Sequence, residues 1–152
     1  MGVEIVPGVP ADVPAAARMI ARALRDDPVV GVLIPGAHDR ERRLTTVYEA
    51  GPRLCLAEGG AREGPSDSSA PVPRQNAVAP AARGRGVGSA LLRHRLARID
   101  GALPGRPGAP AHLEATTAAS RALHERHGFR LPEMLDLTAD GYPAAMERAG
   151  RP

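Results

Sequence analysis

A glycine-rich segment followed at once by a helix-like run constrains this chain more than any other feature of its sequence. Glycine occupies positions 84, 86 and 88, arginine occupies 83 and 85, and a helical pattern follows over residues 89–100. Alternate glycines permit a tight turn and a close approach of the main chain to a ligand. A helix that begins directly behind the turn presents N–H groups without intrahelical partners. The segment therefore predicts an anion-binding turn, suited to a phosphate-bearing molecule.

Composition narrows the classes of protein that remain. The chain has 152 residues, and we expect one domain over residues 1–152. All 20 basic residues are arginine and the net charge is +3, which suits an anionic ligand. The single cysteine, Cys55, cannot form an internal disulfide, and no run reaches the roughly 20 apolar residues that cross a bilayer. We expect a cytoplasmic protein that does not contact a membrane.

Hydrophobic periodicity indicates strands and helices that alternate along the chain. The pattern predicts helices over residues 13–24, 39–50, 89–100 and 118–127, the last one ended by Gly128, and an apolar connection over 29–34. It predicts strands over residues 3–6, 53–57, 76–79, 111–115, 134–137 and 142–148. Residues 58–75 are rich in Gly, Pro, Ser and acidic side chains and predict a disordered segment or loop. Together these elements predict an α/β fold of the layered α+β type.

Two segments in this order resemble the GNAT superfamily of N-acetyltransferases. The first is the run Val78-Ala79-Pro80-Ala81-Ala82-Arg83-Gly84-Arg85-Gly86-Val87-Gly88, which is similar to the family's acetyl-CoA-binding motif of strand, (R/Q)-x-x-G-x-(G/A) and helix. The second begins at Leu113-Glu114-Ala115-Thr116 and ends at His124-Glu125-Arg126-His127-Gly128-Phe129, similar to the later strand and the helix that ends in G-F. Gly88 and Gly128 are 40 residues apart, which fits the family's spacing.

The resemblance implies a fold and a cosubstrate. The fold is a mixed sheet flanked by helices, in which two neighbouring parallel strands splay apart around the pantetheine of acetyl-CoA. Residues 58–75 show no strand pattern where relatives have long strands, so we expect the sheet to be incomplete in its middle. The residues that the resemblance assigns to the coenzyme are Asn76, Ala77, Val78, Arg83, Gly84, Arg85, Gly86, Val87, Gly88, Ser89 and Ser120, the last of which replaces the usual helix asparagine.

The family reaction is a direct attack of an amine on the thioester carbonyl. His124 stands where many relatives have a tyrosine that protonates the thiolate, and Glu114 is the candidate base for the amine. The acceptor is expected to be a small-molecule or peptide amine, with no metal and no nucleic acid involved, and the oligomeric state is left open. Plainer interpretations also stay open: His124 and Glu114 as solvent-facing residues, and the protein as an impaired or truncated relative that binds coenzyme A or is an inert remnant.

Overall fold

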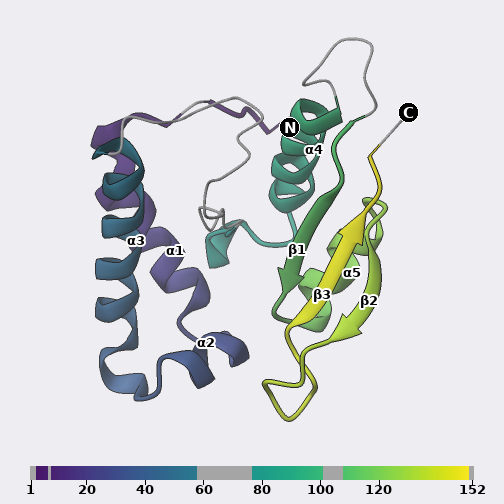
Figure 1. Cartoon of the computed structure of the whole chain (residues 1–152). Coiled ribbons are helices and arrows are strands. Elements are labelled where there is room, and N and C mark those ends of the chain that lie inside the picture. Colours follow the sequence, from purple (N-terminus) through teal and green to yellow (C-terminus); the bar gives the residue numbers. More distant parts are fainter. Residues whose placement is uncertain (1–2, 7, 58–76, 101–107, 151–152) are drawn as a thin grey trace.

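The computed structural model describes residues 3–6, 8–57, 77–100 and 108–150 of the chain. It has two parts, a layer of helices and a small sheet with two helices behind it (Figure 1). The helical layer contains α1 (Val13–Leu24), α2 (Pro28–Leu33) and α3 (Arg40–Ala57), with 3₁₀ turns η1 (Pro10–Asp12) and η2 (Ala37–Asp39). The second part contains η3 (Pro80–Ala82), α4 (Val87–Asp100), β1 (Ala111–Ala115), α5 (Ala118–Glu125), β2 (Arg130–Met134) and β3 (Ala144–Arg148).

The described strands form one three-stranded sheet in the order β1-β3-β2. β3 lies in the centre and pairs antiparallel with both neighbours, with Leu113 opposite Met146 and Ala115 opposite Ala144. The prediction of a layered α/β fold with an incomplete sheet is confirmed. Every strand pairing among the described residues is antiparallel, so the splayed parallel pair that the resemblance implies is not found in this part of the chain.

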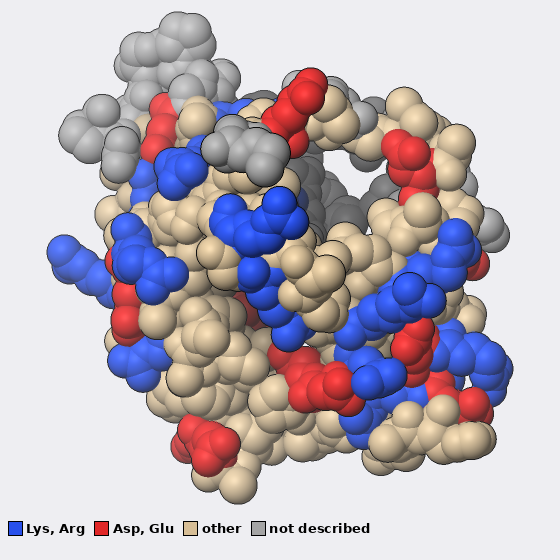
Figure 2. All heavy atoms as spheres, turned by 180° about the vertical axis from the view of Figure 1, so that it is seen from behind, with Lys and Arg blue, Asp and Glu red and all other residues tan. Residues whose placement is uncertain are grey.

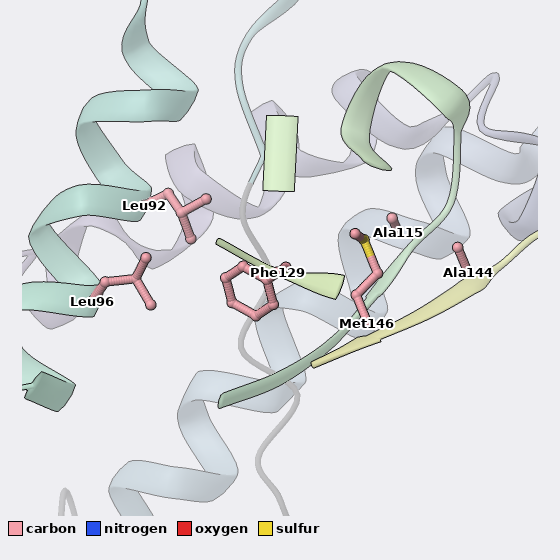
Figure 3. Close-up of a cluster of buried hydrophobic side chains, with 6 residues drawn as sticks. All are labelled: Leu92, Leu96, Ala115, Phe129, Ala144 and Met146. Atoms are coloured by element: carbon pink, nitrogen blue, oxygen red, sulfur yellow. The ribbon is translucent and has the colours of Figure 1, made fainter. Parts of the chain in front are cut away.

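A compact apolar cluster lies between the sheet and the two helices behind it. Leu92 and Leu96 of α4 face Phe129, and Phe129 in turn faces Met146 of β3 (Figure 3). Ala115 and Ala144 complete the cluster of buried side chains. Burial alternates along β1, as the two-residue period of a strand requires, so Ala111, Leu113 and Ala115 face the cluster while His112 and Glu114 face away. The sheet thus has one packed face and one polar face.

In the helical layer, α1 packs against α3. Ala17 and Ala21 are buried on α1 and Leu44 is buried on α3, and the small alanines permit a close approach of the two helices. Among the described residues no helix is both long enough and apolar enough to cross a membrane.

Two side chains tie the helical layer to the second part of the molecule. Asp27 Oδ1 accepts hydrogen bonds from Val29 N (3.0 Å) and Val30 N (3.1 Å), which caps α2. Its Oδ2 accepts from the hydroxyl of Thr116, at the end of β1. Arg83, in front of α4, donates from Nη2 to the carbonyl oxygen of Ala23 (2.8 Å) near the end of α1. Both contacts lie at the α1–α2 corner, where the helical layer meets the end of β1 and the turn in front of α4.

The N-terminal half differs from the sequence predictions at three places. Residues 3–6 form no strand, because no described strand offers them a partner. Residues 29–34 fall largely in α2 instead of an irregular connection, since Asp27 is a helix cap and Pro28 suits the first helical position. Residues 53–57, predicted as a strand, continue α3, because adding a turn to an existing helix costs less than starting a new element. The loop predicted for 58–75 lies outside the described residues.

The C-terminal half differs at two further places. Asn76 lies outside the described residues, and residues 77–79 form no strand: Pro80 begins a 3₁₀ turn and has no N–H for a ladder. The strand predicted for 134–137 is observed earlier, as β2. Pro132 lies within β2 at the point where its register against β3 shifts. Leu135, Asp136 and Leu137 instead bond across the loop to the carbonyl oxygens of Pro143, Gly141 and Tyr142.

The helices predicted over 13–24, 89–100 and 118–127 are confirmed within about two residues, the usual uncertainty of an element boundary. The strand over 111–115 is confirmed at both ends, and β3 begins two residues inside the predicted 142–148. Gly128 has a φ of +87°, as expected of a glycine that ends a helix.

Candidate active site

The glycine loop has the backbone conformation that its sequence predicts. Gly84 and Gly86 have φ angles of +74° and +78°, in the left-handed region that side chains disfavour. A Cβ atom placed on either glycine would meet no atom within 4 Å, so open space lies in front of both. At Gly88 the same atom would lie 3.2 Å from Leu123 Cδ2. Two of the glycines therefore leave room for a ligand, and the third allows α4 to pack against α5.

The first turn of α4 lies directly behind the loop. The first hydrogen bond into this helix runs from Ala90 N to Gly86 O (3.0 Å). The N–H groups of Val87, Gly88 and Ser89 precede it and have no intrahelical acceptor, as at the start of any helix. Together with the positive end of the helix dipole, these amides can hold a diphosphate. An acetyl-CoA diphosphate therefore fits the residues present here.

The predicted coenzyme residues in front of the loop are only partly brought to this site. Asn76 lies outside the described residues. Ala77 and Val78 are half-buried and belong to no helix or strand, and Val78 Cγ2 would lie 3.7 Å from a Cβ on Gly88, so Val78 borders the start of α4. Arg83 directs its guanidinium to the Ala23 carbonyl, whereas Arg85 is exposed. Figure 2 views the molecule from behind and shows basic side chains distributed over that face, with acidic side chains between them.

His124 points into the protein. Its side chain is 8% exposed, its ring lies edge-on to Phe129 with centroids 5.7 Å apart, and Nδ1 is buried with no hydrogen-bond partner among the described residues. Burial lowers the pKa of His124 below the ordinary value of a histidine; the backbone of Ser120 opposes this shift in part, and the nearby His127 adds to it. The plain interpretation of His124 as a solvent-facing residue is therefore wrong. The ring is uncharged at neutral pH.

Glu114 lies on the other face of the sheet. It is exposed on β1 and stands in one row with Ala145 of β3 and Glu133 of β2. Because His124 packs beside Phe129 under the opposite face, the structure does not bring Glu114 and His124 together.

Ser120 is occupied by a local role. Its Oγ donates to Thr117 O (3.0 Å) and accepts from Thr117 N (3.2 Å), and its N–H donates to Thr117 Oγ1 (3.2 Å). This capping box satisfies main-chain groups at the start of α5. A contact between Ser120 and the coenzyme stays a prediction.

An open groove with a volume of about 750 Å³ lies along the second half of α4, from Arg93 to Asp100, and no residue of the glycine loop lines it. It runs along α4 to the turn after α5 and to the end of β3. The charged side chains that line it are Arg93, Asp100, Arg126, Arg130, Glu147 and Arg148, together with His127. Among the described residues no group of three or more His, Cys, Asp or Glu side chains gathers as a metal site.

One polar contact beside the start of α4 is not predicted by the sequence pattern. His127 Nε2 lies 3.2 Å from Ser89 Oγ and so joins the turn after α5 to the first turn of α4. The signal was present, because His127 directly precedes the Gly-Phe that ends the helix of the second motif. The position of His127 predicts no function, since a lone histidine shows no spacing that indicates a metal ligand or a catalytic group.

A glycine turn leads into α4, and α4 lies beside a strand and a helix that is followed by Gly128 and Phe129. The family model of the acetyltransferase (GNAT) domain matches residues 41–131, more than half of the chain. The protein therefore belongs to the GNAT acetyltransferase family, whose domains use acetyl-CoA as cosubstrate. Among curated proteins, none matches this chain.

Proposed function

We propose that this protein is an N-acetyltransferase that transfers the acetyl group of acetyl-CoA to an amine. The observation that carries the proposal is the glycine loop, because its two glycines with positive φ leave open space directly in front of the unpaired amides of α4. The family match supports the acetyl group as the cargo. The acceptor is a small-molecule or peptide amine.

The coenzyme diphosphate binds the amides that begin α4, which places the acetyl thioester on the side of β1 and α5. The second edge of β1 pairs with no described strand, so its main-chain groups are available to the pantetheine and to the thioester oxygen. Glu114 removes the amine proton on the polar face of the sheet, directly or through one water. The amine nitrogen then forms a bond to the carbonyl carbon, and the carbon–sulfur bond breaks.

His124 serves the departing sulfur from the packed face of the sheet. Its uncharged ring donates an N–H hydrogen bond to the sulfur as negative charge develops there. The sulfur leaves as the thiolate of coenzyme A and takes up a proton from solvent, and the proton that Glu114 removes from the amine passes to solvent. Burial without a partner costs a polar atom roughly 1–3 kcal/mol, and a ligand that contacts Nδ1 relieves this cost. His124 is thus poised for a ligand that enters beside α5.

The predicted roles of His124 and Glu114 can be tested by two conservative variants. His124→Phe keeps an aromatic ring beside Phe129, and Glu114→Gln keeps the shape of an exposed side chain. Each variant is expected to lower kcat for acetyl transfer about 100-fold, since general acid or base catalysis contributes 10²–10⁴. The affinity for acetyl-CoA, measured by calorimetry, is expected to stay within about twofold of the parent. This is well below the tenfold change in the dissociation constant that a loss of about 1.4 kcal/mol would cause.

Glu133→Gln is the matched control for Glu114→Gln. Both glutamates are exposed and both lie opposite Ala145 in the register. The control is expected to transfer acetyl groups at the parental rate. Parental rates in His124→Phe or Glu114→Gln would remove that residue from the mechanism while leaving the coenzyme site intact.

The second candidate function is a relative that binds coenzyme A without transferring its acetyl group. It is favoured by one observation, that the described sheet has only three strands and therefore less surface to hold an acceptor. An assay of thiol release with a panel of small and peptide amines separates the two functions. A parent chain that binds acetyl-CoA and acetylates no amine would support the binding function.

A further inference from the structure

His127 lies at the junction of the two helices behind the sheet, in the turn that follows α5. Its Nε2 is 3.2 Å from the hydroxyl of Ser89, the third residue of α4. The N–H of Ser89 is one of the amides without an intrahelical acceptor. His127 therefore touches the helical turn that faces the predicted diphosphate, although the mechanism above assigns it no part.

Charged groups act on His127 directly or line the groove that it shares. Those that act on it directly are Arg93 of α4, His124 of α5 and Arg126 in the following turn. Those that line the same groove are Asp100 of α4, Arg130 of β2, and Glu147 and Arg148 of β3. Asp100 and Arg148 pair with each other at 2.7 Å and so cancel. Arg93 and Arg126 form no salt bridge with any described residue. Their charges are left to act on His127.

The surroundings of His127 disfavour a protonated imidazole as long as no anion is bound. Burial lowers the pKa of His127, and the positive charges of Arg93 and Arg126 lower it further. A diphosphate on the first turn of α4 would reverse the local balance of charge. The negative charge would offset the repulsion from both arginines and would favour the protonated ring.

We infer that His127 positions the Ser89 hydroxyl for the diphosphate of acetyl-CoA and takes up a proton when the diphosphate binds. In the protonated ring Nε2 carries hydrogen and must donate to Ser89 Oγ. The Ser89 hydroxyl hydrogen is then free to donate to a phosphate oxygen. The result is a chain of two hydrogen bonds from imidazolium to hydroxyl to phosphate, in which each bond strengthens the other. This inference rests on the proposed function.

The sign of the pH dependence follows from the direction of the pKa change. Because binding raises the pKa of His127, the coenzyme binds more tightly as the pH falls through the interval between the free and bound values. Each unit by which binding raises the pKa corresponds to about tenfold in affinity. Above the bound pKa the ring is neutral in both states, and the histidine contributes no further pH dependence.

The test is calorimetric titration with acetyl-CoA between about pH 5 and about pH 8, the interval in which histidines titrate. The parent is compared with His127→Gln, whose amide nitrogen can donate to Ser89 but cannot take up a proton. His94→Asn is the control, since His94 is exposed on α4 and does not line the groove. The parent and the control are expected to gain about tenfold in affinity at low pH relative to His127→Gln, for a pKa rise of about one unit.

Ser89→Ala tests the hydrogen-bond chain itself. Removing the hydroxyl is expected to weaken binding at low pH by roughly 10- to 150-fold, as for a hydrogen bond to a charged group. The same substitution made in the His127→Gln variant is expected to cost less, because the two residues act as one unit.

Proton uptake measured on the unmodified chain gives a second readout that does not depend on folding of a variant. Binding heats in buffers of different ionisation enthalpy are expected to show uptake by the protein. Equal pH profiles for the parent and His127→Gln, or no proton uptake by the parent, would overturn the inference and leave the proposed function standing. A parent chain that does not bind acetyl-CoA at any pH would overturn both.

Discussion

Gly86→Val is expected to weaken the binding of acetyl-CoA at least about 100-fold, through the loss of two or more charge-assisted hydrogen bonds of about 1.5–3 kcal/mol each. Gly86 has a φ of +78°, where a β-branched side chain is strained, and open space lies where its Cβ would stand. The substitution therefore moves the loop amides and fills the space reserved for the diphosphate. Calorimetric titration of the variant with acetyl-CoA measures the loss.

The control for this variant is Gly36→Val. Gly36 has a similar φ of +85° but lies between α2 and η2, where its Cβ would approach only the flexible end of Arg43, at 3.3 Å. Both variants are expected to lose about 1–3 kcal/mol of folding stability from backbone strain. Only Gly86→Val is expected to lose affinity. Equal affinities in the two folded variants would show that the loop does not contact the coenzyme.

Arg148→Ala is expected to lower the free energy of unfolding by about 3–5 kcal/mol, because it removes both charge-assisted hydrogen bonds of a mostly buried ion pair with Asp100. Arg148 donates from Nη1 and Nη2 to the two oxygens of Asp100 at 2.9 and 2.7 Å. The two side chains are only 7% and 18% exposed, and the hydrogen bond to Asp100 raises the pKa of Arg148. The pair joins the end of β3 to the end of α4. Urea unfolding measures the change.

The matched control is Arg121→Ala. Arg121 and Glu125 pair at 2.8 Å within α5, with side chains 37% and 44% exposed. Water screens such a pair, so its loss is expected to cost less than about 0.5 kcal/mol. Replacing both members of the inner pair, as Asp100→Leu with Arg148→Met, is expected to cost less than Arg148→Ala alone. A loss of under about 1 kcal/mol in Arg148→Ala would mean that the pair does not hold β3 to α4.

Helices with a clear apolar stripe and a flanking cap could be predicted from the sequence, because their pattern is local. Examples of such local patterns are the apolar stripe of α1, the glycine turn before α4 and the glycine after α5. Asp27-Pro28 was interpreted only as the end of α1, although the same two residues cap and begin α2. An Asp-Pro pair can follow one helix or begin another, and only the structure of the residues after it distinguishes the two cases.

Strands were harder to predict, since a strand forms only where another strand pairs with it. Residues 3–6 and 77–79 have strand-like composition, yet no described strand pairs with them. β2 contains Pro132, which lowers the strand signal, and the sheet accepts the proline through a shift of register. β1 and β3 were found because their alternating pattern matches a sheet with one packed face.

In the candidate site, too, local features could be predicted from the sequence and tertiary contacts could not. The positive φ of Gly84 and Gly86 could be predicted, because few other residues adopt that conformation at low cost. The inward orientation of His124 could not, since a helix position does not reveal its tertiary neighbours. The contact of His127 with Ser89 joins residues on two separate elements, and its meaning depends on the arginines that the fold gathers beside it.

The most direct test of the central claim is a calorimetric titration of the folded parent chain with acetyl-CoA, with Gly86→Val beside it. The loop and the family match predict saturable binding at one site, with a dissociation constant between about 1 μM and about 1 mM, the range of enzyme substrates. Binding by the parent and its loss in Gly86→Val is the predicted result. A folded parent that takes up no acetyl-CoA at about 1 mM would contradict the account.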